Sequence, residues 1–507
     1  MSNLMALSPL WVVALGLLLL MLTDAIVHST TTPSSGAYKS EVSGGGVSSE
    51  MAIGTAIVMF AGACFAWAMS RSLSPLEDSS ALKAIALDAF AYQAMCFICV
   101  LSGLVSLLAG EYLPEHRMHR TEFFLLLGWS TLGAMALACS ADMLTLFVAL
   151  ETMSLGTYCL VGLRRTGRSI EAALKYFLLG SFASALLLFG IALLYGATGT
   201  TEFKGIATSI ASMNDKSATI PWVLAGAALV VTGLMFKIAA VPFHAWTPDA
   251  YEGAPTAATA YMAAVVKTGA FCMLLRVLLV ALPDPRLMSW GAGWTHALAG
   301  IAVITMTFAN VVAARQSSVK RMLAYSSISH AGYALIGMAA MLGSRDAQSS
   351  VMMYIVTYSL STLGAFGSLM WAGSRGNEVA SYDDLAGLGR RNPPVALAFS
   401  VFIFSLAGIP PTAGFFGKLG VFKVAVDANL IWLVLVGLVN SVIATYYYLK
   451  VVVVMYMKEP SQGMPEAKPM HAPMLATALV VTAILVLALG LFPGAVLNGL
   501  ASASLSG

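Results

Sequence analysis

Long apolar stretches recur along the whole chain, separated by short polar connections. A membrane-spanning helix needs about 20 mostly apolar residues, and a window of that length finds fourteen such stretches. The interval 204–220 is too polar to span and predicts a surface loop or a short interfacial helix. The pattern therefore predicts an all-α polytopic membrane protein with about fourteen transmembrane helices, whose approximate limits are 8–28, 50–70, 86–109, 121–139, 142–163, 171–195, 221–251, 256–282, 294–314, 319–342, 347–373, 393–426, 430–457 and 473–499.

Composition agrees with this pattern. Hydrophobic residues make up 59% of the chain, charged residues only 10%, and the mean hydropathy is +0.83, values typical of a polytopic membrane protein. Residues 29–50 are rich in Ser, Gly and Thr and predict a linker that buries no core. Residues 1–11 contain no Lys or Arg, so we expect the first stretch to be a span and not a signal peptide. The small, scattered net charge of +3 argues against a nucleic-acid partner.

Two of the apolar stretches contain prolines at their centre. Proline has no backbone N–H and its ring crowds the carbonyl four residues earlier, so Pro242 and Pro248 interrupt the seventh stretch. Pro410 and Pro411 interrupt the twelfth. Irregular backbone at membrane depth is tolerated where protein or water satisfies the freed polar groups, and transporters use such breaks to build polar sites.

The two breaks lie five helices apart, which predicts a repeat. If stretches four to eight and nine to thirteen are equivalent, an odd number of helices per unit inverts the second unit relative to the first. The expected organisation is two inverted five-helix repeats, each with a broken helix. Its boundaries are an N-terminal three-helix segment with the linker at 1–120, a first repeat at 121–282, a second repeat at 294–457 and a C-terminal helix at 473–507.

The distribution of Lys and Arg predicts the orientation. With the N-terminus outside, fourteen Lys and Arg residues fall on the inner side and six on the outer side. Positive charge is enriched in cytoplasmic loops, and an even number of spans returns the chain to its starting side. We therefore expect both termini on the outer side.

Five charged residues lie deep inside the predicted spans, whereas others, such as Asp88, Lys423 and Lys450, sit nearer the span ends and are expected to be anchors. Each of the five would cost roughly 2.5 to 3.5 kcal/mol at a helix centre unless it is paired or hydrated, so we expect them to face one another or water. Burial disfavours an ammonium and a nearby carboxylate favours it, so Glu151 and Lys237 can act as a switch that holds or releases a proton. A static ion pair, or a lysine that reaches the surface, is the alternative. The five residues are Glu151, Lys175, Lys237, Lys267 and Lys418.

Hydroxyl and imidazole side chains could connect these charges. His244 lies beside the first break, and four further residues are candidates for a proton wire, although a histidine within a helix is often only a packing residue. They are His330, Tyr333, Ser327 and Tyr358. The six cysteines all lie in apolar runs, so we expect small hydrophobic residues and no metal site.

Five motifs in a fixed order carry a resemblance that extends from about residue 86 to the end. They are FVALETMSLGTYCLVG, RSIEAALKYFLLGSFASALLLFGIALLYG, FKIAAVPFHAWTPDAYEGAPT, KRMLAYSSISHAGY and LAGIPPTAGFFGK. The chain resembles the antiporter-like membrane subunits of respiratory complex I, which include subunits L, M and N of bacterial NADH-quinone oxidoreductase. YEGAPT after WTPD and a lysine at 418 resemble the subunit N branch, because subunit M usually has a glutamate there. Subunit L carries a long C-terminal lateral helix that has no counterpart after Phe492.

The resemblance implies a proton-translocating membrane subunit of a redox-driven NADH:quinone oxidoreductase in the bacterial inner membrane. It implies a coupled pair of Glu151 and Lys237, with Lys175 on the cytoplasmic side, Lys267 on the central axis and Lys418 on the exit side. The sequence has no nicotinamide fingerprint, flavin site or iron–sulfur cysteine motif. We therefore expect no cofactor in this chain, with FMN, iron–sulfur clusters and quinone in partner subunits. Subunits M, K and J are the expected neighbours.

Two other classes of function stay open, and a purely structural subunit is the least favoured interpretation. A subunit of an Mrp-type cation/proton antiporter would use the same Glu and Lys residues. Membrane-bound hydrogenases contain similar subunits, and a nickel–iron partner would indicate that class. A purely structural membrane subunit fits less well, because it would not need five charges inside its spans.

Overall fold

The computed structural model describes residues 3–30, 44–71, 84–116, 118, 121–214, 217–289, 293–373, 378–459, 472–503 and 505. In the first half the helices are α1 Asn3–Ala6, α2 Ser8–Thr30, α3 Gly44–Arg71, α4 Ala89–Glu115, α5 Glu122–Cys139, α6 Met143–Gly162, α7 Gly167–Thr198, α8 Phe203–Ser212, α9 Ile220–Ile238, α10 Trp246–Gly253, α11 Thr256–Tyr261, η1 Met262–Val266, α12 Lys267–Arg276 and η2 Val277–Ala281. In the second half they are α13 Pro285–Met288, α14 Trp294–Ala314, α15 Val319–Ala339, α16 Ala347–Ala372, α17 Tyr382–Leu385, α18 Leu388–Arg391, α19 Pro393–Ala407, α20 Ala413–Asp427, α21 Ile431–Met457, α22 Pro473–Leu491 and α23 Pro493–Ala501.

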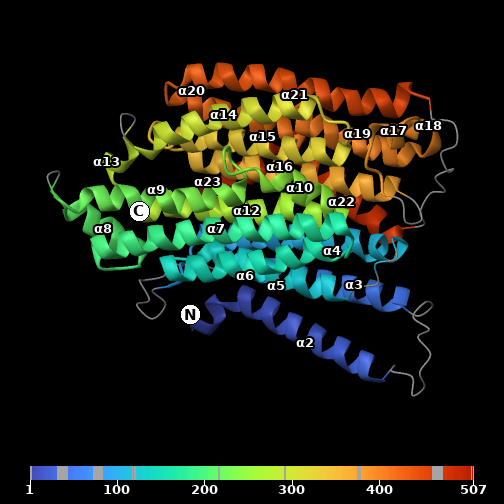
Figure 1. Cartoon of the computed structure of the whole chain (residues 1–507), viewed down its shortest axis with the longest axis horizontal. Helices are drawn as coiled ribbons and strands as arrows, with labels where there is room; N and C mark the ends of the chain where they lie inside the picture. Colours follow the sequence, from blue (N-terminus) through green and yellow to red (C-terminus); the bar gives the residue numbers. More distant parts are fainter. Residues whose placement is uncertain are drawn as a thin grey trace.

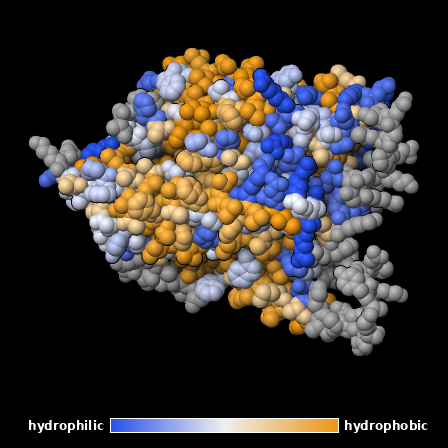
Figure 2. Space-filling model, in the orientation of Figure 1, coloured by the Kyte–Doolittle hydropathy of each residue, from blue (hydrophilic) through white to orange (hydrophobic). Residues whose placement is uncertain are grey.

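The long helices run side by side in one bundle (Figure 1). Among the described residues, 12 helical stretches are long and apolar enough to cross a membrane. Two further elements complete the expected fourteen spans: α15, which is 21 residues long but more polar, and the broken pair α19 and α20. An apolar band covers the middle of the molecular surface between more hydrophilic ends, as a membrane protein requires (Figure 2).

Two sequence expectations about the polar intervals are refined. The polar interval after the sixth span contains α8, whose Phe203, Ile206 and Ile210 are buried, which matches a short interfacial helix. Part of the predicted linker is helical, because α2 continues to Thr30 and α3 begins at Gly44. Residues 31–43 of that linker lie outside the described residues.

Both broken helices end their first half in the same way. Ala239 and Gly408 adopt left-handed backbone angles, with φ of 62° and 84°. The next residue then bonds back over the helix end: Ala240 N donates to Met235 O, and Ile409 N donates to Phe404 O, each at 3.0 Å. This is the hydrogen-bond pattern of a Schellman helix terminus, which satisfies carbonyls that would otherwise be free. The sequence correctly predicted the breaks at Pro242 and at Pro410 and Pro411.

A second matched feature relates the two five-helix repeats. The N-terminus of α6 is tied to the segment before α8 by Met143 N donating to Thr201 O at 2.9 Å. The N-terminus of α15 is tied to the segment before α17 by Val319 N donating to Ala380 O, also at 2.9 Å. Helices α8 and α17 lie at opposite ends of the bundle (Figure 1). Equivalent connections at opposite ends are what an inverted repeat produces.

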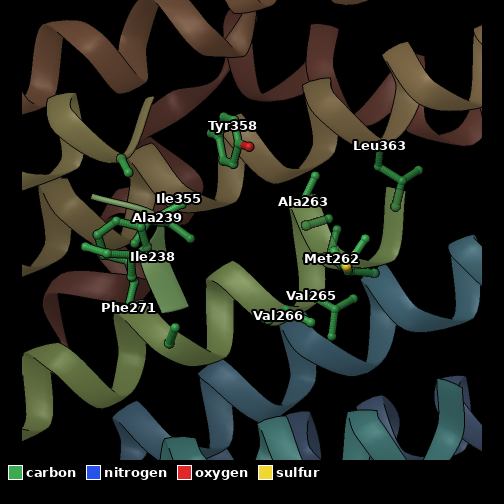
Figure 3. Packing of buried hydrophobic residues seen from close by; sticks show 14 of the residues in the cluster. Ile238, Ala239, Met262, Ala263, Val265, Val266, Phe271, Ile355, Tyr358 and Leu363 are labelled. Carbon is green, nitrogen blue, oxygen red and sulfur yellow. The ribbon is translucent and has the colours of Figure 1, made fainter. Parts of the chain in front are cut away.

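The eighth span is less regular than its sequence predicts. Two π-helical segments, η1 and η2, flank α12, so that Lys267 directly follows a π-helical turn. Such turns are rare and are found frequently at functional sites. The span packs into the centre of the molecule, where Met262, Val265 and Val266 of η1 lie among apolar side chains that include Leu363 of α16 (Figure 3).

An ion pair fixes the far end of this span to the N-terminal helices. Arg276 is 2% exposed and donates two hydrogen bonds to Asp88, at 2.8 and 2.9 Å. Its Nε also donates to Ala138 O of α5 at 3.1 Å. Asp88 in turn accepts from Ala91 N and so caps α4. A bidentate pair of this kind fixes orientation as well as charge.

Candidate functional site

Lys237 lies in an aromatic cage at the end of α9. Its side chain is 1% exposed, and its Nζ donates to the Tyr158 hydroxyl at 3.3 Å. The same nitrogen lies 5.1, 5.2 and 5.5 Å from the ring centres of Tyr158, Tyr176 and Phe236. Aromatic faces attract a cation within about 6 Å, and the carbonyl end of a helix also favours positive charge. The cage therefore stabilises a charged lysine in a buried position.

The cage is completed from the other side of the break. Trp246, the first residue of α10, stacks on Tyr176 with ring centres 4.2 Å apart and an interplanar angle of 10°. Its indole N–H donates to Phe236 O at 3.0 Å. Phe236 O also accepts from Ala239 N at 3.1 Å, so α10 and the end of α9 share one carbonyl, and the first break is tied directly to the surroundings of Lys237.

Glu151 and Lys237, the predicted pair, do not form a direct ion pair in the described part of the chain. Glu151 is near enough to act on Lys237 electrostatically. Its carboxylate accepts a hydrogen bond from Ser184 of α7. Tyr158 lies on the Glu151 face of α6, since a spacing of seven residues is two helical turns, or about 10 Å. The expected pair is therefore held by two hydroxyl groups, Ser184 on Glu151 and Tyr158 on Lys237.

Lys175 is not buried, contrary to the sequence expectation. Its side chain is 48% exposed and forms ion pairs with Glu171 at 2.8 Å and Asp249 at 3.0 Å. Asp249 also pairs with Arg321 of α15 at 3.0 Å. The physical reason is length: α7 has 32 residues and is about 48 Å long, so its first turns can extend beyond a hydrocarbon core of about 30 Å.

His244 lies within the first break, as predicted. Its ring packs edge-on against Phe308 of α14, with ring centres 4.9 Å apart. Its Nδ1 has no hydrogen-bond partner within the described part of the chain. The break is anchored to α14 by Val241 N, which donates to Thr305 Oγ1 at 3.1 Å.

Lys267 occupies the centre of the protein and contacts α15. It is 2% exposed, and its Nζ donates to Ser327 O. The Ser327 hydroxyl accepts from Tyr358 at 2.7 Å and lies 3.4 Å from the Tyr251 hydroxyl. Tyr251 belongs to α10, and its ring is 6.2 Å from that of Trp246. The first break is thereby connected to the central lysine.

His330 continues this polar group toward the second break. Its Nδ1 lies 2.6 Å from the Tyr354 hydroxyl and its Nε2 3.1 Å from the Tyr448 hydroxyl. Its ring centre is 4.8 Å from that of Tyr358 and 6.0 Å from that of Tyr333. The structure therefore brings together all four predicted wire residues, Ser327, His330, Tyr333 and Tyr358.

Lys418 lies at the second break. It is 6% exposed, and its Nζ donates at 2.8 Å to Ala407 O, the last carbonyl of α19. The same nitrogen is 5.1 Å from the ring centre of Tyr333. Lys418 thus resembles Lys237 as a buried ammonium beside an aromatic ring, and it contacts a helix carbonyl end in addition.

The described residues contain no group of three or more His, Cys, Asp or Glu that could hold a metal ion, and their cysteines are all free. The chemistry that these side chains offer is proton transfer. Lysine, histidine and hydroxyl groups can each hold or pass a proton, and they lie in contact across the centre of the bundle.

Comparison with known proteins identifies the family. Residues 140–444 match the model of the NADH:quinone oxidoreductase/Mrp antiporter transmembrane family. The chain belongs to this family. It is similar to NADH-quinone oxidoreductase subunit N 1 of Sorangium cellulosum, with 55% identity over 493 residues and 96% of both chains covered. Subunit N of Trichlorobacter lovleyi is 43% identical over 83% of this chain and 84% of its own.

Solved structures of the family have the same fold. A chain of respiratory complex I from Thermus thermophilus is 31% identical, with a TM-score of 0.78, and the match covers 98% of this chain and 100% of that one. A chain of the Mrp complex from Dietzia has a TM-score of 0.79 at 21% identity, over 99% of this chain and 97% of that one, which is a likeness of fold alone. The matched family region contains both breaks and every candidate proton-transfer residue.

Sequence reasoning missed several contact residues of this family member. Tyr158 shares a helical face with Glu151 and could have been found from its spacing. Tyr448 lies in a run of three tyrosines in α21, of which Tyr447 and Tyr448 are buried and Tyr446 is exposed, and the run itself gave no indication of this difference. Ser184 and Asp249 depend on how α7 and α10 pack, which periodicity does not determine.

Proposed function

We propose that the chain is the proton-translocating subunit N of an NADH-quinone oxidoreductase. The proposal is supported by 55% identity over nearly the whole chain to a relative with that name, and by similarity to a chain of a solved respiratory complex I. A role in an Mrp-type antiporter or a membrane-bound hydrogenase is less well supported, because the Mrp likeness is at 21% identity.

The observation that carries the proposal is the contact series between the two breaks. It begins at the Lys237 cage, passes through Trp246 and Tyr251 to Ser327 and Lys267, and continues through His330 and Tyr333 to Lys418. Buried charges are costly in a membrane and are usually functional, so three buried lysines in one series indicate a path for protons.

The residues have distinct roles in this proposal. Glu151 and Lys237 exchange a proton near the first break, with Lys175 at the more exposed end and His244 in the break itself. Lys267 holds a proton at the centre, the wire residues Ser327, His330, Tyr333 and Tyr358 pass it on, and Lys418 delivers it near the second break. The breaks at Pro242, Pro410 and Pro411 give water access, and the carbonyl of Ala407 at the second break holds Lys418.

The chain would be driven by partner subunits. We propose that it is a non-redox subunit of a translocase, that FMN, iron–sulfur clusters and quinone belong to the partners, and that subunits M, K and J are neighbours. We place it in the bacterial inner membrane with both termini on the outer side, because the loops of the opposite side carry most of the Lys and Arg. The unit boundaries 1–120, 121–282, 294–457 and 473–507 belong to the same proposal.

Substitution of the first pair tests the function. Glu151→Gln or Lys237→Ala should leave the complex assembled and lower proton pumping per NADH oxidised by about tenfold or more, because each removes a proton-transfer group. Pumping is measured in inside-out membrane vesicles beside NADH:quinone electron transfer, with the exposed Lys458→Ala as control. Pumping at the wild-type ratio in both variants would refute the proposal.

A further inference from the structure

A largely buried carboxylate that the relay does not use lies at the α17 and α18 end of the bundle. Glu378 belongs to the connection between α16 and α17, and its side chain is 15% exposed. It accepts hydrogen bonds from Thr256 N at 3.3 Å and Thr256 Oγ1 at 3.1 Å. It also pairs with Arg164, and with Lys320 at 3.6 Å.

These contacts join the ends of three helices that carry relay residues. Arg164 follows α6, the helix of Glu151. Thr256 begins α11, and Lys267 lies eleven residues, or about 16 Å, further along the same span. Lys320 is in the first turn of α15, the helix of Ser327 and His330. One carboxylate therefore holds elements of both repeats.

The groups around the carboxylate form what we call the Glu378 cluster, which comprises Tyr112, Arg164, Thr256, Lys320 and Glu378. Tyr112 of α4 accepts from Thr256 N at 3.0 Å and from Arg164 at 3.2 Å. Lys320 is 2% exposed and donates to Ala254 O at 2.6 Å. Glu252 of α10 acts on Lys320 electrostatically. The cluster thus places two cations on one carboxylate in a largely buried setting.

The charge of Glu378 decides how strongly the cluster holds together. When ionised, the carboxylate attracts both cations and accepts from the N-terminus of α11, where negative charge is also favoured. When protonated, it loses both attractions and leaves two neighbouring cations that repel each other. Burial opposes the ionised form, and the hydrogen bond from Thr256 N favours it. Burial prevails and raises the pKa of Glu378 to about 8.

We infer that Glu378 is a positioning residue whose protonation state controls how the ends of α6, α11 and α15 are held, and through them the relay between the repeats. The inference rests on the proposed function. Gain of a proton at Glu378 loosens the cluster, and loss of the proton tightens it. No proton of the relay needs to pass through this residue.

Two substitutions separate charge from shape. Glu378→Gln keeps the size and hydrogen bonding but is neutral at every pH, and Glu378→Asp keeps a titratable group. Pumping per NADH oxidised is measured in membrane vesicles from about pH 6 to pH 9, across the titration of a carboxyl with a raised pKa. Glu378→Gln should match the wild type near pH 6, where Glu378 is protonated. Above about pH 8 it should fall at least about fivefold below the wild type, because only the wild type ionises there.

The controls distinguish this inference from the proposed function. Asp383→Asn removes an exposed carboxylate at the same end of the bundle and should not change the pH profile. Lys237→Ala in the same assay reports the relay itself, so normal pumping there would refute the proposed function whatever Glu378 does. Loss of pumping in Lys237→Ala together with an unchanged pH profile in Glu378→Gln would overturn only the inference.

Assembly is measured alongside, because two unpaired cations could prevent folding. If Glu378→Gln does not assemble, the double variant Glu378→Gln with Lys320→Met replaces it, since this variant removes one charge of each sign. The same pH profile is expected for it. Glu378 would be only a structural residue if neither variant assembled. The same conclusion would follow if Glu378→Asp lost the wild-type pH profile as Glu378→Gln does.

Discussion

Tyr158→Phe is the most direct test of the Lys237 cage. The substitution removes one oxygen atom and keeps the ring 5.1 Å from the ammonium, so the cation–π contact is retained. What is lost is the hydrogen bond from Lys237 Nζ at 3.3 Å. A hydrogen bond to a charged group contributes about 1.5 to 3 kcal/mol, and we take the lower half of this range because the bond is long.

That loss changes the balance between charged and neutral Lys237. Because 1.4 kcal/mol is a factor of ten, a loss of about 1.5 to 2 kcal/mol lowers the ratio of charged to neutral lysine by about 10- to 30-fold. Proton pumping per NADH oxidised should fall by a similar factor in vesicles, while the amount of assembled complex stays the same. The Tyr158 hydroxyl also packs closely against Gly180, because a Cβ added to this glycine would lie only 2.0 Å from the hydroxyl oxygen. The ring therefore has little freedom to move away.

A matched control uses another tyrosine of the chain. Tyr446 is 62% exposed on α21, and Tyr446→Phe removes a hydroxyl from a surface position. It should leave pumping within the error of the measurement. If Tyr158→Phe pumps as well as Tyr446→Phe, the hydroxyl has no part in the charge balance of Lys237, and the described cage would be a packing feature only.

Two further predictions concern other charged residues. Lys418→Ala should lower proton pumping about tenfold with assembly preserved. Lys418→Glu should retain part of the pumping, because the position needs a titratable group. Equal pumping in both variants would contradict a relay role. Asp88→Asn should destabilise the complex by about 1 to 3 kcal/mol, because it leaves Arg276 buried without its carboxylate. Thermal unfolding in detergent measures this loss, with Asp383→Asn as control. An unchanged unfolding temperature would refute the prediction.

The fold could be predicted from the sequence to the level of spans and breaks. Length and hydropathy define a transmembrane helix well, and Pro242, Pro410 and Pro411 reveal the breaks because proline cannot complete the helix hydrogen bonds. The π-helical turns around α12 could not be predicted, since the sequence of that span has the ordinary period of a helix. They lie in a span that is packed into the centre of the molecule.

The candidate site was predicted less completely than the fold. Charged residues inside apolar stretches stand out, so Glu151, Lys237, Lys267 and Lys418 were found. Lys175 was expected to be buried and is exposed, because the apolar window did not reveal its ion pairs with Glu171 and Asp249. Glu378 was missed altogether, because a carboxylate in a polar connection looks solvated in the sequence and only tertiary packing buries it.

The polarity of α15 has a consequence for how the chain is made. This helix carries Ser327, His330 and other polar residues and is less apolar than the other spans, so it would partition poorly into lipid as an isolated segment. It follows α14 after a connection of only four residues and packs against it. We therefore expect the translocon to release α14 and α15 together as a helical hairpin, with Lys320 and Arg321 retained on the ribosome side. Biogenesis of the second repeat would then depend on the apolar α14 carrying its polar neighbour into the bilayer.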